Sequence, residues 1–155
     1  MSAHRTRTLT ARLALGLGAA AVLATGADHL YEYAANNFAT VPTIGTLFLM
    51  NFIAATAVGV GLLLPLRRLV PRLADPIRAM LVVAGIGLAA SSLVGLWISE
   101  TSGLFGFMDN GFRTTIVVAI VSESIAVLAL SAYLALAGLH VSHRSLHLRT
   151  HRGTS

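Results

Sequence analysis

The chain has 155 residues, of which 55% are hydrophobic and only 11% are charged, so it is about one domain long and more apolar than a typical soluble domain. Its net charge of +5 comes from arginine without lysine, and the arginines form short clusters between long apolar runs. This distribution argues against a nucleic-acid partner and favours a role in membrane orientation. With no cysteine, the chain has no disulfide, thiolate metal site or cysteine nucleophile.

Four apolar segments are long enough to cross a hydrocarbon layer of roughly 30 Å, which requires about 20 helical residues. We expect spanning helices at about 9–27, 44–64, 79–99 and 114–139, with tails at 1–8 and 140–155. The second and third segments hold no charged residue and the fourth holds only Glu123, whereas a helix on the surface of a soluble protein would show a polar face. The sequence therefore predicts an all-α integral membrane protein, a four-helix bundle in the lipid bilayer.

The arginines predict the orientation of these helices, because excess positive charge in short flanking segments marks the cytoplasmic side. Ten of the eleven arginines lie at the start of the chain, in the connection between the second and third helices, and in the C-terminal tail. The two other connections hold only Arg113. We therefore expect both termini in the cytoplasm and a multi-pass location in the plasma (inner) membrane. The arginine clusters would also attract anionic lipid at the cytoplasmic face.

The first apolar segment has a second interpretation. Its basic start, its apolar stretch 13–24 and the small residues Thr25, Gly26 and Ala27 resemble a signal peptide with its cleavage site. Cleavage would leave three helices with the same orientation. The sequence alone does not decide between a retained and a cleaved first helix.

Three charged or titratable residues fall together at the outer end of the first helix: Asp28, His29 and Glu32. His29 and Glu32 share a helical face if the helix continues that far. An imidazole and a carboxylate at this spacing are candidates for binding a small ligand or a divalent metal, or for relaying a proton, and Glu100 or Asp109 could complete the set. Two ligands alone make no metal site, and the alternative is an exposed, solvated helix cap.

Small residues at four-residue spacing favour close packing of helices in lipid. The second helix offers Ala55 with Gly59, and the third helix offers Gly87, Ser91 and Gly95. We expect these stripes to form a tight bundle or to contact another membrane protein.

Glu123 is the most informative residue, because it lies roughly 13 Å below the outer end of the fourth helix at 1.5 Å per residue. An acidic side chain near a helix centre costs about 2.5 to 3.5 kcal/mol to insert, and it usually faces other helices and marks a pathway or binding site. Asn51 and Ser92 lie about 10 Å deep on their own helices. We expect a polar cluster in the outer half of the bundle with Glu123 as its floor. The alternative is a structural polar link between helices.

The connection 99–109 alternates glycines with Leu and Phe, and it has two interpretations. It can fold back over the mouth of the bundle as a lid, or its aromatic side chains can lie in a belt at the level of the lipid headgroups. The belt would contain Trp97, Phe105, Phe107, Phe112, Tyr31, Tyr33 and Phe38.

Four histidines of the C-terminal tail would share one face of a helix: His140, His143, His147 and His151. They are typical of a metal-binding stripe or, with the arginines between them, of a basic tail beside the membrane. The sequence shows no membrane-embedded histidine pair for a haem, no glycine-rich phosphate loop and no Ser, His and Asp set of a hydrolase. It requires no cofactor and gives no positive indication of an enzyme.

Several stretches resemble a group of small uncharacterised four-helix membrane proteins of actinobacteria. The resemblance rests on His29–Leu30, Pro42–Leu49, Ser99–Phe107 and Glu123, and it covers roughly residues 13 to 138. It implies the four-helix membrane fold and carries no activity with it. A more distant similarity in size and topology to DoxX-like membrane proteins is analogy alone.

Three functions stay open on these observations. The first is a binding or transport-type protein whose cluster around Glu123 receives a small ligand, a proton or a cation from the extracytoplasmic side. The second is an accessory or scaffold subunit that uses small-residue helix faces to join a larger membrane complex or a homo-oligomer. The third is a membrane redox subunit that acts on quinone or metal.

Overall fold

The computed structural model describes the backbone of residues 3–106 and 113–150 and the side chains of residues 5–106 and 113–137. The described residues form α1 (Ala3–Ala34), the 3-10 helix η1 (Phe38–Thr40), α2 (Ile44–Leu63), α3 (Leu66–Leu69), α4 (Ala74–Thr101) and α5 (Thr114–Thr150). Four of these helices, α1, α2, α4 and α5, are long and apolar enough to span a membrane. The all-helical class and the four candidate spans predicted from the sequence are confirmed.

Three of the long helices extend well beyond the expected limits. α1 runs from Ala3 to Ala34, α4 begins at Ala74, and α5 continues to Thr150. Hydropathy marks only the portion of a helix that suits hydrocarbon, whereas polar residues continue the same helix on either side. Pro76 fits into the first turn of α4 because the backbone N–H groups there have no partner within the helix. The extension of α1 brings His29 and Glu32 into the helix itself.

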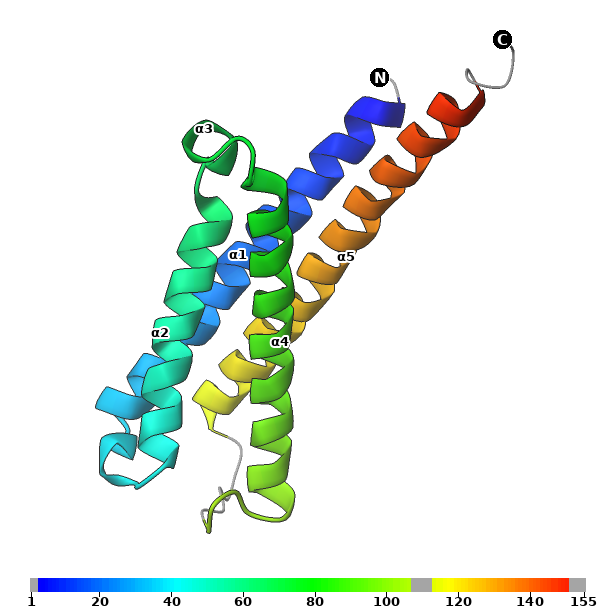
Figure 1. The fold of residues 1–155 in the computed structure, drawn as a ribbon. Coiled ribbons are helices and arrows are strands. Elements are labelled where there is room, and N and C mark those ends of the chain that lie inside the picture. Colours follow the sequence, from blue (N-terminus) through cyan, green and yellow to red (C-terminus); the bar gives the residue numbers. More distant parts are fainter. Residues whose placement is uncertain (1–2, 107–112, 151–155) are drawn as a thin grey trace.

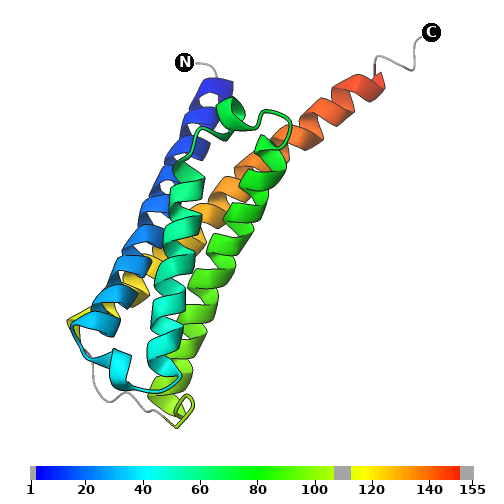
Figure 2. The same cartoon turned by 60° about the vertical axis from the view of Figure 1, so that its left-hand side comes forward.

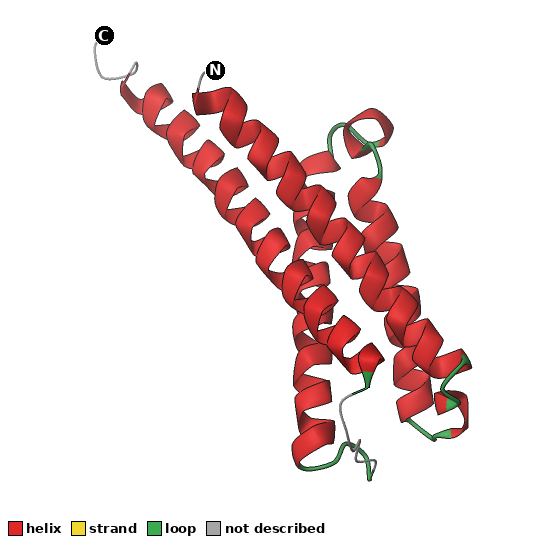
Figure 3. Cartoon of the chain, turned by 180° about the vertical axis from the view of Figure 1, so that it is seen from behind, coloured by secondary structure: helices red, strands yellow, loops and turns green. Residues whose placement is uncertain are grey.

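The four long helices pack side by side in a ring. α1 contacts α2 and α5, and α4 contacts the same two helices. Figure 1 and Figure 2 show the start of α1, α3 and the end of α5 at one end of the molecule, and η1 with the connection after α4 at the other end. We call these the α3 end and the η1 end. Seen from behind in Figure 3, α1 and α5 run alongside each other over most of their lengths.

One stripe of buried residues on each of α1 and α5 recurs at spacings of three and four. On α5 the stripe contains Ile116, Ala119, Glu123, Ala126 and Leu130, and on α1 it contains Gly18, Val22, Thr25, His29 and Glu32. This spacing keeps one stripe of each helix turned toward its neighbours, as in coiled-coil packing. Ala19, Ala21, Gly26, Ser122 and Ala129 are buried beside these stripes. Toward the η1 end, polar side chains occupy positions of the stripe that apolar side chains fill elsewhere.

Glycines allow Leu130 of α5 to fill the centre of the packing. A Cβ atom at Gly18 of α1 would lie 2.5 Å from the Leu130 side chain, and one at Gly85 of α4 would lie 2.8 Å from it. Gly59 of α2 accepts Leu23 of α1 in the same way, at 2.6 Å. Close approach of α5 to α1 and α4, and of α1 to α2, therefore depends on these three positions.

The small-residue stripe predicted on the third helix does not take part in this packing. Gly87 and Ser91 are exposed, and a Cβ atom at Gly87 would have nothing within 4 Å. Gly85 and Ala89 are buried instead. Positions two apart on a helix differ by about 200°, so a stripe through Gly87 faces away when Gly85 faces inward. The prediction that this stripe tightens the bundle is wrong, whereas Ala55 and Gly59 of α2 are buried as expected.

One arginine of the α3 end closes the C-terminus of α2. The Arg78 guanidinium donates hydrogen bonds to the backbone oxygens of Leu62, at 3.1 Å, and Leu64, at 3.0 Å. Carbonyl groups at the C-terminal end of a helix have no partner within it, and a cation there also interacts favourably with the negative end of the helix dipole. Arg78 therefore contributes to the fold in addition to the charge bias of this end.

Candidate functional site

Most of the buried polar side chains gather in the half of the protein that lies toward the η1 end. The buried polar or charged residues in the described part of the chain are Thr25, His29, Glu32, Ser99, Ser122 and Glu123. All but Ser99 belong to α1 and α5. The burial of so many polar groups between two adjacent helices is unusual for a core and calls for hydrogen-bond partners.

Glu123 is the most deeply buried of these groups, with a side chain that is 0% exposed. Neither of its carboxyl oxygens has a hydrogen-bond partner among the described residues. The Ser92 hydroxyl of α4 lies near the carboxyl, but the two groups form no hydrogen bond of normal geometry. Asp28 lies close enough to act on it electrostatically. A carboxyl group left in this state is costly, and it marks a place where a proton or ligand would bind.

Both ring nitrogens of His29 have partners, one within α1 and the other on α4. Its Nδ1 atom lies 2.9 Å from the backbone oxygen of Thr25, and because a carbonyl can only accept, Nδ1 must carry a proton and donate it. Its Nε2 atom lies 3.1 Å from the Ser92 hydroxyl. The side chain is only 6% exposed, so the alternative of a solvated helix cap is wrong. The error follows from the expectation that the first helix ends near Ala27.

A second hydrogen-bonded link joins α1 to α5 beside Glu123. The Thr25 hydroxyl donates to the Ser122 hydroxyl at 3.2 Å, and Ser122 donates to the backbone oxygen of Ala119 at 3.1 Å. Both hydroxyl side chains are buried. The link fixes the level at which α1 meets α5, and it therefore fixes how far His29 lies from Glu123 along the helices.

Charged and aromatic side chains cover these links toward the η1 end. Glu32 lies one turn beyond His29 and is 5% exposed, and its carboxylate lies 3.8 Å from the Arg113 guanidinium. The Arg113 guanidinium also lies 5.4 Å from the centre of the Phe38 ring, a cation–π distance. Phe38 meets Phe48 edge to face, and Phe48 meets His29 in the same manner, with ring centres 4.9 Å and 5.2 Å apart.

The segment before α2 fixes the position of Phe38. Thr43 has a φ angle of 68°, and the Ile44 N–H donates to the Pro42 oxygen at 2.7 Å, which makes a tight turn that a β-branched residue rarely adopts. Gly45 lies directly against the backbone carbonyl of Phe38, where a Cβ atom would overlap that oxygen. The strained turn and the close contact at Gly45 together hold η1 against the start of α2.

The structure describes five of the seven aromatic residues expected in the belt. Three of the belt residues are strongly exposed: Tyr31, Trp97 and Phe105. Phe38 is buried instead, because it packs under Arg113 and against Phe48. Phe107 and Phe112 lie outside the described residues, so the choice between a lid and a belt stays a prediction.

Two predicted site residues stand apart from the Glu123 group. Asn51 and Glu100 are partly buried, and Asn51 Oδ1 and Glu100 Oε1 have no hydrogen-bond partner among the described residues. Asn51 lies within α2 as predicted, whereas Glu100 lies in the last turn of α4 instead of in the connection after it. No hydrogen bond among the described residues joins either side chain to His29, Ser92 or Glu123.

The structure describes only some of the residues predicted to bind a metal. In the part of the chain that it describes, no three His, Asp or Glu side chains converge to hold a metal ion. Both nitrogens of His29 are already engaged, so neither is open to a metal in this arrangement. Asp109 and His151 lie outside the described residues, as do the side chains of His140, His143 and His147.

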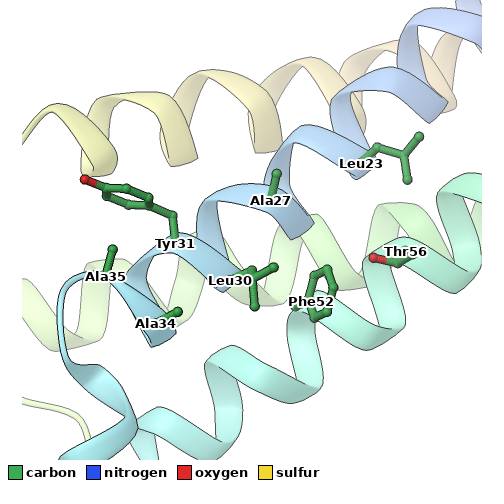
Figure 4. A pocket seen from close by; sticks show the side chains of 8 residues that line it. All are labelled: Leu23, Ala27, Leu30, Tyr31, Ala34, Ala35, Phe52 and Thr56. Carbon is green, nitrogen blue, oxygen red and sulfur yellow. The ribbon is translucent and has the colours of Figure 1, made fainter.

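Two mainly apolar grooves lie on the outside of α1. One, with a volume of about 540 Å³, lies between α1 and α2, and Figure 4 shows that α2 contributes Phe52 and Thr56 to it. The other, of about 400 Å³, lies between α1 and α5 and includes Ser122. Neither groove is lined by His29, Ser92 or Glu123. A ligand that filled either groove would therefore not touch the Glu123 carboxyl directly.

Sequence reasoning missed two parts of this site, the link between Thr25 and Ser122 and the cover made by Phe38 and Phe48. The spacing of Thr25, His29 and Glu32, at four and three residues, is the signal that could have revealed a polar stripe on α1. No comparable signal in the sequence pairs an aromatic residue before α2 with one inside it.

Comparisons with protein-family models, with curated proteins and with solved structures give no match for this chain. A functional conclusion therefore depends on the geometry of the site.

Proposed function

We propose that this protein is a multi-pass membrane protein that binds or moves a small ligand, in particular a proton or a small cation, at Glu123. The observation that carries the proposal is a fully buried carboxyl group whose two oxygens have no hydrogen-bond partner among the described residues. Acidic residues inside membrane spans usually face the interior and mark ion or proton pathways. The nearby Ser92 and the link between Thr25 and Ser122 supply further oxygen atoms around the carboxyl.

The proposed orientation places the α3 end in the cytoplasm and the η1 end outside the plasma membrane, with the helices as a four-helix bundle. In the part of the chain that the structure describes, nine arginines lie in the three segments that reach toward the α3 end, and Arg113 precedes α5 at the other end (Figure 1). Positive charge in such segments marks the cytoplasmic side. We also propose that α1 is retained, because the part that cleavage would remove supplies Val22 and Thr25 to the interior.

Single cysteines test this orientation directly, because the natural chain contains none. Asn36→Cys places a thiol at the η1 end and Arg72→Cys places one at the α3 end, and both positions are exposed. We expect a membrane-impermeant maleimide to label Asn36→Cys on intact cells and Arg72→Cys only after permeabilisation. The cysteine-free parent protein is the control for background, and the reverse labelling pattern would contradict the proposed orientation.

Infrared difference spectroscopy of the protein in lipid vesicles tests the binding role of Glu123. We expect a change in external pH or sodium concentration to alter the band of a buried carboxyl group, and we expect Glu123→Gln to abolish that change. Asp75→Asn is a matched control, because it also removes one carboxylate but at a side chain that is 80% exposed at the α3 end. A band that survives in Glu123→Gln, or a wild-type protein that responds to neither ion, would refute the proposal.

An accessory subunit is the second candidate function, and the outer face of α4 favours it. Gly87 and Ser91 are exposed there, which would permit the backbone of another membrane helix to approach closely. Native mass spectrometry of the detergent-solubilised protein separates the two candidates. A partner or second copy retained equally by the wild type and Glu123→Gln, together with no response to pH or sodium, would favour the accessory subunit.

A further inference from the structure

We infer that the cargo of the Glu123 site is a proton and that the Ser92 hydroxyl relays it between Glu123 and His29. The inference rests on the proposed function and specifies its substrate. Two hydrogen bonds carry it: His29 Nδ1 to the Thr25 carbonyl at 2.9 Å and His29 Nε2 to the Ser92 hydroxyl at 3.1 Å. The Ser92 hydroxyl also lies near the Glu123 carboxyl without a hydrogen bond of normal geometry, so the relay requires the hydroxyl to turn toward it. The side chains of His29, Ser92 and Glu123 each come from a different helix.

The donor and acceptor roles open to these groups couple the protonation of His29 to that of Glu123. The Thr25 carbonyl holds a proton on Nδ1, so in a neutral ring Nε2 is an acceptor and Ser92 must donate its single proton to it. Ser92 can then only accept from Glu123, which requires a protonated carboxyl. If Glu123 is ionised, Ser92 must turn its proton toward the carboxylate, and Nε2 must itself carry a proton to donate to the Ser92 oxygen.

The two arrangements interconvert by the movement of two protons. The O–H bond of the Glu123 carboxyl breaks as its proton binds to the Ser92 oxygen, and the original O–H bond of Ser92 breaks as that proton binds to the lone pair of Nε2. A carboxylic acid and a neutral imidazole become a carboxylate and an imidazolium, and the hydroxyl is regenerated. Charge and atoms balance without an oxidant, a reductant or another reactant.

The charged groups around the relay suit exchange of this proton with the η1 end. Glu32 acts electrostatically on His29 from the same helix, and Arg113, just before α5, pairs with Glu32. Asp28 of α1 acts on Glu123. The contact of His29 with α2 is the uncharged Phe48 ring, and its contact with α4 is the Ser92 hydroxyl. A carboxylate next to an imidazolium stabilises its charge, so Glu32 supports the state in which His29 holds the proton.

The packing around the site favours a proton over a larger cargo. Glu123 is 0% exposed, and neither of the two outer grooves is lined by Glu123, His29 or Ser92. Both nitrogens of His29 already have partners, so no ring nitrogen is available to coordinate an ion. A proton requires only a chain of donors and acceptors, which these three side chains provide.

Time-resolved infrared spectroscopy after a pH jump tests the relay on the full chain in lipid vesicles. The amplitude of the carboxyl band reports whether Glu123 binds a proton, and its rate reports how the proton arrives. We expect Ser92→Ala to retain the amplitude and to slow the rate about tenfold or more, in line with the loss of a positioned proton donor. Ser92→Thr keeps the hydroxyl, and we expect it to restore the rate.

Ser91→Ala is the matched control, because Ser91 is exposed and its hydroxyl bonds the backbone oxygen of Leu88 at 2.9 Å. We expect no change in its rate. Nitrogen-15 NMR of His29 gives a second readout: Nε2 should gain a proton as Glu123 loses one in the wild type, but not in Glu123→Gln.

The outcomes separate the relay from the function on which it rests. A wild-type rate in Ser92→Ala, or an Nε2 atom that stays unprotonated as Glu123 ionises, would refute the relay and leave Glu123 as a binding site. A carboxyl band that responds to sodium at constant pH would also refute the relay, because the cargo would then be a metal cation. A wild-type protein without any response would refute both.

Discussion

Glu123→Met is expected to raise the free energy of unfolding while it abolishes the response to pH. Methionine has a similar length and flexibility but no oxygen that requires a partner. In the native protein both carboxyl oxygens are buried without a hydrogen-bond partner among the described residues. An acidic residue near a helix centre costs about 2.5 to 3.5 kcal/mol in insertion scales, and the nearby Ser92 offsets part of this, so we expect a gain of about 1 to 3 kcal/mol. Denaturant unfolding in one fixed detergent measures the difference.

Glu123→Gln is the matched control for this substitution. It removes the titration but keeps a polar group of the same shape, so we expect its stability to stay close to that of the wild type. A binding site and a structural link at Glu123 predict changes of opposite sign in the unfolding free energy of the methionine variant. A structural link between helices would leave its partners unsatisfied when Glu123 is replaced, and the protein would be destabilised. A less stable Glu123→Met would therefore show that the carboxyl holds the helices together, and it would contradict a binding site that costs stability.

The four candidate spans could be predicted because the length and hydropathy of an apolar segment can be read directly from the sequence. The ends of the helices could not, because α1 continues past Ala27 through residues such as Asp28 and Glu32 that a hydropathy argument excludes from a span. This single difference changes the interpretation of His29. An imidazole beyond the end of a helix meets solvent, whereas the same residue within α1 faces α4 and is buried.

Depth along a helix could be predicted better than direction around it. Glu123 stands out as the one charged residue of its segment, and counting residues gives its depth. The same counting places Asn51 and Ser92 at equal depth, yet among the described residues it is Ser92 that hydrogen-bonds His29 and lies near Glu123, whereas Asn51 Oδ1 has no hydrogen-bond partner. Direction depends on how the helices rotate against one another, and that is decided by the packing of side chains from all of them. Gly87 and Ser91 show the same difficulty, because their spacing is recognised in the sequence but their outward direction is not predicted from it.

Leu130→Ala is expected to cause the largest loss of stability, about 2 to 5 kcal/mol, by removing the side chain at the centre of the packing. Leu130 is 0% exposed and reaches Gly18 of α1 and Gly85 of α4. In a membrane this loss is one of van der Waals contact rather than of the hydrophobic effect, because lipid is as apolar as leucine. Leu128→Ala is the matched control, because Leu128 is 70% exposed on the same helix. Equal losses in the two variants would contradict the packing described above.

A second substitution tests whether the space left by Leu130 accounts for that loss. In the wild type, Gly85→Ala brings a Cβ atom within 2.8 Å of Leu130, whereas its distances to Val58 and Val22 would be an ordinary 3.4 Å and 3.5 Å. With Leu130 shortened, only the favourable contacts are left. We expect Gly85→Ala to be unfavourable alone and stabilising in the Leu130→Ala background, a coupling of about 0.5 to 3 kcal/mol in a double-mutant cycle of unfolding free energies. Leu130 lies two turns from Glu123 on the same buried stripe. The amplitude of the carboxyl band after a pH jump, measured in the same variants, therefore shows whether proton binding at Glu123 requires the close packing around Leu130. Additive losses with an unchanged amplitude would show that this packing and the site are independent.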